Sequence, residues 1–211
     1  MKKEISIPVS ISSRTEYKRK FSFLELYRTY LLLPKAITAM IRNKKKQLIH
    51  ENFIERIHLA ITEVNGCAAC SYAHTYMALN QGMSSEEINS FLSGDGRFIN
   101  ETEAKAIVFA QHFADTRGFP KADAYQAITK EYGEEKAHII ISAAQIMLAG
   151  NIYGIPMSAF KSRLSGKPFK ESSLFYELGM QIFGILLLPI ALLHGSLNAL
   201  VGVSNIRLDQ A

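Results

Sequence analysis

The chain has 211 residues, of which 48% are hydrophobic and 20% are charged, a balance typical of a globular protein and unlike that of a disordered one. Its length allows one domain with extensions, or two small domains, with a core of useful size. Two cysteines do not make a disulfide-rich secreted scaffold, and residues 1–8 contain no apolar segment after their lysines. We therefore expect no signal peptide and a cytoplasmic location.

Positive charge is concentrated in the first part of the chain. Residues 1–50 carry 12 lysines and arginines against 3 acidic residues, for a net charge of +9, whereas the remainder carries −4. The densest cluster is Lys44-Lys45-Lys46. Such a patch suits an acidic partner, nucleic acid or lipid headgroups. Because no aromatic interleaving or nucleic-acid motif accompanies the charge, we favour a solvated arm and expect no nucleic-acid partner.

Hydrophobic residues recur at helical spacing along most of the chain. Residues 1–20 are polar and irregular, and residues 21–41 are predicted to be helical, with Pro34 as a kink or a new helix start. Further helices are predicted over 50–64, 67–81, 100–118, 121–132 and 134–149, and a short helix is predicted to begin at Ser84. Asn65-Gly66 and Gly133 end two of them, and a capping box between Ser84 and Glu87 opens the short one. The helix over 134–149 is expected at the centre of the core. No run of alternating strand residues is present, so the predicted fold is all-α.

The C-terminal part combines a polar segment with a strongly apolar one. Residues 160–173 are predicted to be a linker. Residues 179–203 have nearly the length of a membrane span, but Gln181, Pro189 and His194 interrupt them, and the longest apolar run, 182–193, is too short. We therefore favour two helices broken near Pro189 and buried in the protomer or between protomers. An apolar surface of this kind predicts a homo-oligomer rather than a membrane protein.

The only two cysteines are three residues apart, in Cys67-Ala-Ala-Cys70, and His74 follows one turn later. On a helix these three side chains fall within an arc of about 60° on one face. Cys67 lies in the first turn, where free N–H groups favour a thiolate. Ala68 and Ala69 are expected to leave the sulfur atoms accessible. The pattern predicts a dithiol that closes to a disulfide and reopens.

Two alternatives to a redox dithiol remain open. Cys67, Cys70 and His74 could bind a metal together with an acidic fourth ligand, although structural zinc usually draws on a second pair of ligands, and none is apparent. The cysteines could also be small hydrophobic residues of the core. An isolated intracellular pair at this spacing favours the redox interpretation.

The residues around the pair resemble a known family. Ile54-Glu55-Arg56, with Asn65-Gly66-Cys67-Ala-Ala-Cys70-Ser-Tyr-Ala-His74, is similar to the alkylhydroperoxidase D branch of the carboxymuconolactone decarboxylase-like superfamily. That branch carries Glu-x11-Cys-x2-Cys-x3-His, and Glu55, Cys67, Cys70 and His74 fill every position. The segments 82–88 and 102–106 are also typical. The resemblance covers residues 45–160, leaving a basic extension over 1–44 and a linker with an apolar helical extension over 161–211.

The resemblance implies an AhpD-like helical bundle that assembles as trimers or hexamers and needs no cofactor or metal. Its activity would be that of a thiol-dependent peroxidase or disulfide oxidoreductase, not of the lactone decarboxylases, which lack the cysteine pair. Cys70 would attack the hydroperoxide and Cys67 would resolve the sulfenic acid to a disulfide. A dithiol reductant protein or a lipoyl group would then reduce it. His74 and Glu55 would form the proton relay that deprotonates Cys70, with Cys70 as the inner sulfur and Cys67 as the outer one.

Glu55 is the residue on which sequence pattern and resemblance disagree. On a helical wheel it lies opposite Phe53 and Ile57, which favours a solvated surface position, although Leu59 on its side hints at a covering helix. If Glu55 is buried beside His74, the role that the resemblance implies for it is favoured over a surface position. A rival hypothesis is a non-enzymatic binding or membrane-associated module of the same fold.

Other side chains receive structural assignments. The histidines His58, His112 and His138 are expected to be packing or surface residues without a role at the site. Tyr72 and Tyr76 are expected to pack against a neighbouring helix, with a place in the lining of the pocket as the alternative for Tyr72.

Overall fold

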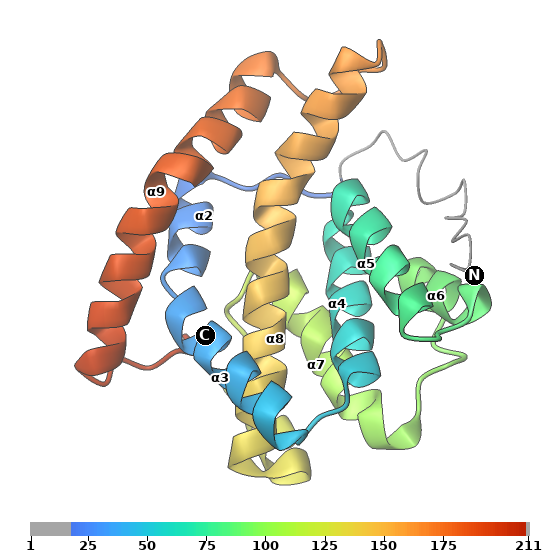
Figure 1. The fold of residues 1–211 in the computed structure, drawn as a ribbon, viewed down its shortest axis with the longest axis vertical. Helices are drawn as coiled ribbons and strands as arrows, with labels where there is room; N and C mark the ends of the chain where they lie inside the picture. Colours follow the sequence, from blue (N-terminus) through green and yellow to red (C-terminus); the bar gives the residue numbers. More distant parts are fainter. Residues whose placement is uncertain (1–17, 210–211) are drawn as a thin grey trace.

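The computed structural model describes residues 18–209, and within them every regular element is a helix (Figure 1). This confirms the predicted all-α fold. The helices are α2 (Phe23–Tyr30), α3 (Leu33–Lys46), α4 (Glu51–Asn65), α5 (Ala68–Asn80), α6 (Ser85–Ser93), α7 (Glu101–Asp115), α8 (Ala122–Leu164) and α9 (Leu174–Leu200). The assignment of residues 1–17 to an irregular arm lies outside the described residues.

Local signals in the sequence place most helix ends. Ser22 accepts a hydrogen bond from the Glu25 amide while the Glu25 carboxylate accepts one from the Ser22 amide, and α2 begins there. Pro34 lies in the first turn of α3 and therefore begins a second helix, which was one of the two predicted alternatives. Gly66 ends α4 in the left-handed conformation with φ of 73°, which favours glycine. The predicted helix ends near residues 34 and 66 are thus confirmed.

Helix α8 is the central element of the fold. It packs against α2, α3, α4, α5, α7 and α9. Gly133 (φ 73°, ψ 162°) interrupts its helical geometry, which matches the predicted end of one helix and start of another. The second part continues to Leu164, so the predicted linker over 160–173 is shorter than expected.

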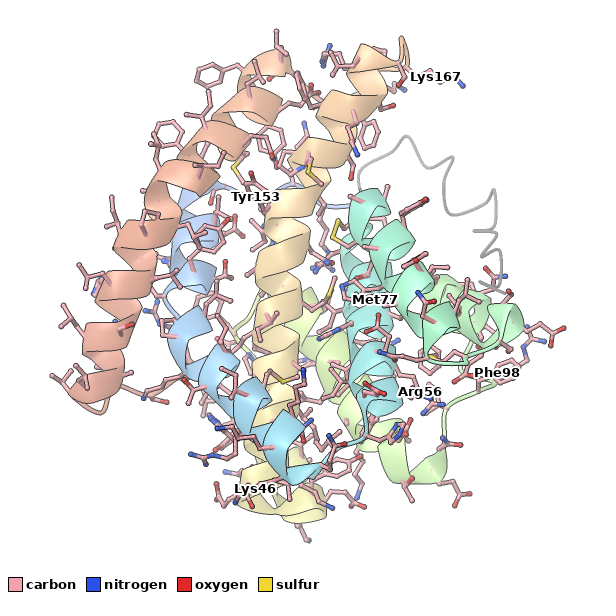
Figure 2. The ribbon with its side chains drawn as sticks, viewed as in Figure 1. Lys46, Arg56, Met77, Phe98, Tyr153 and Lys167 are labelled. Atoms are coloured by element: carbon pink, nitrogen blue, oxygen red, sulfur yellow. A yellow bond between two sulfur atoms is a disulfide. The ribbon has the colours of Figure 1, made fainter. Side chains whose placement is uncertain are left out.

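Helix α4 is the second buried element, because α5, α6, α7 and α8 all pack against it. Arg56 of α4, labelled in Figure 2, joins three of these helices. Its guanidinium donates to Glu87 of α6 at 2.7 Å and to Glu103 of α7 at 3.0 Å. These side chains are largely shielded from water, so the pairs hold the helices in register more firmly than surface pairs would.

The extensions pack onto the same structure as the centre of the chain. Helices α2, α3 and α8 contact α9, and the main hydrophobic core includes residues from Phe21 to Ala191. Helices α3 and α8 run through the expected boundaries at 44/45 and 160/161. The division into a basic extension, a core and an apolar extension stays a prediction.

The expected break near Pro189 is wrong. Helix α9 is continuous from Leu174 to Leu200 with Pro189 inside it. A proline removes one helical hydrogen bond, here the one to the carbonyl of Ile185. Both residues lie on the exposed side of α9, so the helix tolerates the loss without sealing an unpaired carbonyl in the core.

Candidate functional site

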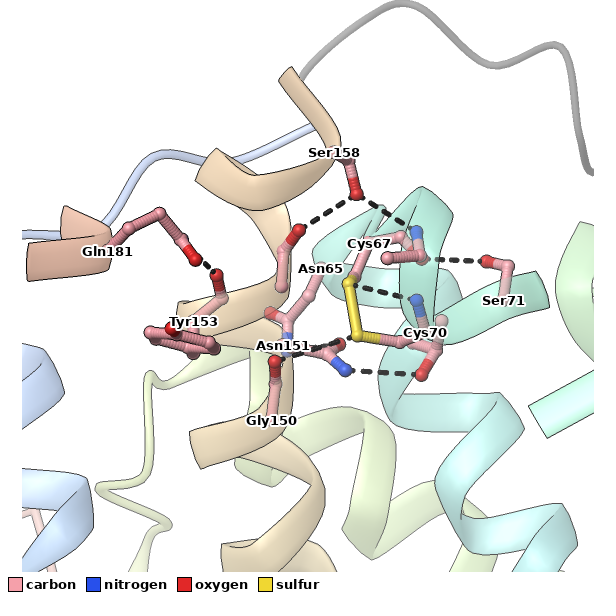
Figure 3. Close-up of a disulfide and its surroundings, with 12 residues drawn as sticks. Asn65, Cys67, Cys70, Ser71, Gly150, Asn151, Tyr153, Ser158 and Gln181 are labelled. Carbon is pink, nitrogen blue, oxygen red and sulfur yellow. Dashed lines mark hydrogen bonds between the residues drawn. A yellow bond between two sulfur atoms is a disulfide. The ribbon is translucent and has the colours of Figure 1, made fainter. Parts of the chain in front are cut away.

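Cys67 and Cys70 form a disulfide at the start of α5 (Figure 3). Cys67 is the N-cap residue, and its sulfur accepts a hydrogen bond from the Cys70 amide at 3.2 Å. The Asn65-Gly66 turn that ends α4 leads directly into this cap, so the two cysteines begin the helix that follows Glu55 in the chain. The dithiol predicted from spacing is therefore present in its closed form.

Helix α8 covers the disulfide. A Cβ atom added at Gly154 would lie 2.8 Å from both sulfur atoms, and the Cys70 sulfur is 3.6 Å from the Gly150 carbonyl oxygen. Ser158, one turn later, accepts from the Ala69 amide at 2.9 Å and donates to the Gly154 carbonyl at 2.8 Å. Only a residue without a side chain permits this approach of α8 to the sulfurs.

This cover corrects two expectations. Cys67 has no exposed surface and Cys70 is 8% exposed, so the small neighbours Ala68 and Ala69 do not leave the sulfur atoms accessible. The order of burial is also the reverse of the expected one, since Cys70 is the outer residue and Cys67 the inner. The physical reason is that α8 packs over both sulfur atoms at Gly154, a contact that the pattern of α5 alone does not register.

Glu55 lies beside His74. The distance between Glu55 Oε1 and His74 Nδ1 is 2.5 Å, and Glu55 is only 4% exposed. The solvated position favoured by the helical wheel is therefore wrong, because α5 packs against α4 on that side. In this arrangement the His74 Nδ1–H donates to the carboxylate, which leaves Nε2 of the ring as a proton acceptor.

The charge on Glu55 is stabilised despite its burial. Burial alone raises the pKa of this carboxyl, but the imidazoles of His58 and His74 outweigh that effect and lower the pKa to about 2. Glu55 is thus a carboxylate throughout the neutral range, as the base that orients a histidine must be.

His58 is the residue that the sequence interpretation missed. Its Nδ1 is 3.6 Å from Glu55 Oε2, and its ring meets the His74 ring edge to face at 4.9 Å. Both ring nitrogens are buried, and neither has a hydrogen-bond partner among residues 18–209. Burial lowers the pKa of His58, and the charge of His74 adds to this, while Glu55 opposes it. The available signal was the spacing Glu55-x-x-His58, which places both side chains on one face of α4.

The three residues Glu55, His58 and His74 could also hold a metal ion, since one ligand atom from each lies within 4.8 Å of the others. Two histidines and a carboxylate suit a divalent transition metal. The set proposed from the sequence, Cys67 and Cys70 with His74, is not available in this state because the sulfur atoms are bonded to each other.

The other singled-out residues lie away from the disulfide or serve structural roles. His112 accepts a hydrogen bond from the Lys121 amide at 3.1 Å, a structural role as expected. His138 lines a groove between α3 and α9. Tyr72 and Tyr76 are exposed on α5, so the expectation that they pack against a neighbouring helix is wrong for the protomer.

Residues 33–110 match the family model of the carboxymuconolactone decarboxylase family. This match contains all four residues of the Glu-Cys-Cys-His pattern and confirms the resemblance at the level of the superfamily that includes AhpD-like proteins. It begins at α3, before the expected start at residue 45, and ends within α7. No curated protein and no solved structure matches the chain significantly. Since the family includes enzymes, an enzymatic function is supported in general terms.

Proposed function

We propose that this protein is a thiol-dependent oxidoreductase that reduces hydroperoxides through the Cys67–Cys70 disulfide. The observation that carries the proposal is a closed cysteine pair at the start of α5, with His74 one turn farther along the same helix and in contact with the buried Glu55 of α4. A structural disulfide would not require an imidazole on the next turn of the helix, oriented by an ionised carboxylate, whereas a thiol that must lose and regain protons does.

In the oxidative half of the cycle, the reduced Cys70 gives its proton to Nε2 of His74, and Glu55 stabilises the imidazolium. The Cys70 thiolate attacks the hydroperoxide, the O–O bond breaks, and the sulfur becomes a sulfenic acid. The leaving alkoxide takes the proton from His74 and departs as an alcohol. The Cys67 thiol then attacks the sulfenic sulfur, which forms the disulfide and releases water.

In the reductive half, an external dithiol, either of a protein or of a lipoyl group, restores both thiols and is itself oxidised. Cys70 is the less buried of the two residues, so we place the partner's attack on its sulfur. Cys67 then leaves as a thiolate that keeps its hydrogen bond from the Cys70 amide. A thiolate held by a helix N-terminus is a good leaving group.

The test is peroxide consumption by the purified full chain, with dithiothreitol and dihydrolipoamide as alternative donors. Two thiols per chain should disappear when the reduced protein meets one equivalent of peroxide. Cys70→Ser should abolish turnover. Its matched control, Cys67→Ser, should still reduce one equivalent of peroxide and retain a sulfenic acid that dimedone labels. A fully active Cys70→Ser protein would contradict the proposal.

The second candidate function is metal binding, which the grouping of Glu55, His58 and His74 favours. Elemental analysis of freshly purified protein tests it. If the wild type contains a stoichiometric divalent metal and His58→Leu does not, the three residues form a metal site and not a proton relay. Its absence from protein that consumes peroxide would favour the relay.

A further inference from the structure

Helix α9 presents a long apolar face to its surroundings. Residues 178–206 contain no Lys, Arg, Asp or Glu. The large side chains exposed along the helix include Phe175, Ile182, Leu186, Leu193, Leu197 and Leu200. Both α8 and α9 are long and apolar enough to cross a membrane, but the apolar window of α8 is 83% buried inside the protein and that of α9 only 22%. A face of this size marks an interaction site.

A cationic groove opens at one end of this face. It lies between α3, α8 and α9, has a volume of about 420 Å³, and is lined by Lys35 and Arg42 of α3, His138 of α8, and Ser196 and Leu200 of α9. Polar donors and an apolar wall therefore meet in one cavity. Such a cavity suits a ligand with an anionic head and an apolar tail.

The positive charge in the groove is available to a ligand. Arg42 makes no hydrogen bond within the described residues. The carboxylate of Glu135 interacts electrostatically with Arg42, but it is paired with Lys46 at 2.8 Å. Lys35 donates to the Val203 carbonyl at 2.5 Å, which leaves its remaining N–H groups for a ligand. Burial and the charges of Arg42 and Lys35 lower the pKa of His138, as expected where cations converge.

We infer that α9 lies on a bilayer containing anionic phospholipids, with a lipid phosphate in the groove at Lys35 and Arg42 and acyl chains against the apolar face. The inner side of α9 packs on α2, α3 and α8, so the helix lies along the surface instead of crossing it. Charge decides between a bilayer and a second copy of the chain. A second copy would bring the same cationic groove and a net charge of +5, whereas anionic headgroups supply the complement.

The experiment measures binding of the full chain to sedimented vesicles of phosphatidylcholine, with or without about one third phosphatidylglycerol. We expect at least tenfold stronger binding to the anionic vesicles. Arg42→Gln should weaken that binding about fivefold, the effect of one well-placed charge. Its control is Lys45→Gln, which removes one exposed positive charge from the same helix outside the groove and should change binding less than twofold.

A second pair of variants tests the apolar face. Leu193 is 65% exposed on α9 and Val108 is 61% exposed on α7. Leu193→Gln should weaken binding to both kinds of vesicle, whereas Val108→Gln should not. The inference is overturned if the chain binds anionic vesicles no more strongly than neutral ones, or if Arg42→Gln and Lys45→Gln weaken binding equally. A stable dimer that Leu193→Gln separates would assign the face to a second copy and also overturn it. None of these outcomes depends on peroxidase activity.

Discussion

Replacement of Glu55 by Gln should remove about 3 kcal/mol of folding free energy at neutral pH. The pKa of this buried carboxyl is about 2 in the folded protein against an ordinary value of 4.5. Each pKa unit corresponds to about 1.4 kcal/mol of differential stabilisation. Because the folded-state pKa is the lower one, the stabilisation is complete above about pH 4.5 and is lost as the pH falls toward 2. Glutamine keeps the shape but cannot carry the charge that the two imidazoles favour.

The assay is urea unfolding of the oxidised protein, followed by circular dichroism at about pH 7, 4.5 and 3. The wild type should lose stability between the last two values, and Glu55→Gln should be flatter over this range. Glu101→Gln, which removes an exposed carboxylate at the start of α7, is the control and should change stability by less than about 0.5 kcal/mol. A loss below 1 kcal/mol in Glu55→Gln at pH 7, or parallel acid profiles of variant and wild type, would refute the buried charge.

Three other substitutions have definite expected outcomes. Gly154→Ala would place a Cβ atom 2.8 Å from both sulfurs and should lower the melting temperature and peroxide turnover, whereas Gly150→Ala, with nothing within 4 Å, should raise the melting temperature because alanine favours the helix. Burial lowers the pKa of His58 in the folded protein, so the unfolded chain takes up that proton first as the pH falls, and the wild type loses stability between about pH 6.5 and 5. The free energy of unfolding of His58→Leu should fall less than that of the wild type over this range. Arg163→Met should cost about 3–5 kcal/mol in urea unfolding by leaving buried Glu177 with its hydrogen bond from Ser172 but without a paired cation among the described residues, and Glu177→Gln in the same chain should recover part of it.

The sequence predicts the helices well because their ends depend on local chemistry. Glycine at 66 and 133, the serine caps and Pro34 act within a few residues of themselves, so spacing alone locates them. Pro189 is the exception. Whether a proline ends a helix depends on what surrounds the freed carbonyl, and α9 is continuous where it packs against α2, α3 and α8, contacts that its own residues do not specify.

The structure brings the predicted residues together in two pairs, Cys67 with Cys70 and Glu55 with His74, but His58 was missed and the surroundings of both pairs were predicted wrongly. A helical wheel ranks the faces of one helix, so it cannot register that α4 is enclosed by four others and that Glu55 is buried with Leu59. The prediction that the sulfur atoms are accessible was wrong for a similar reason. The residue that covers them, Gly154, is more than 80 positions along the chain and carries no signal except the absence of a side chain.

The contacts of α8 indicate how a substrate reaches the buried disulfide. On one side Gly154 touches the sulfurs, and on the other Tyr153 packs against Gly184 of α9 so closely that a Cβ atom there would lie 2.5 Å from its ring. Gln181 also donates to the Tyr153 carbonyl at 3.1 Å (Figure 3). Withdrawing α8 from the disulfide would therefore disturb its packing with α9. Helix α5 carries the cysteines, and its outer face is exposed at Tyr72. Movement of α5 breaks fewer buried contacts, so access to Cys70 is expected from the side of α5.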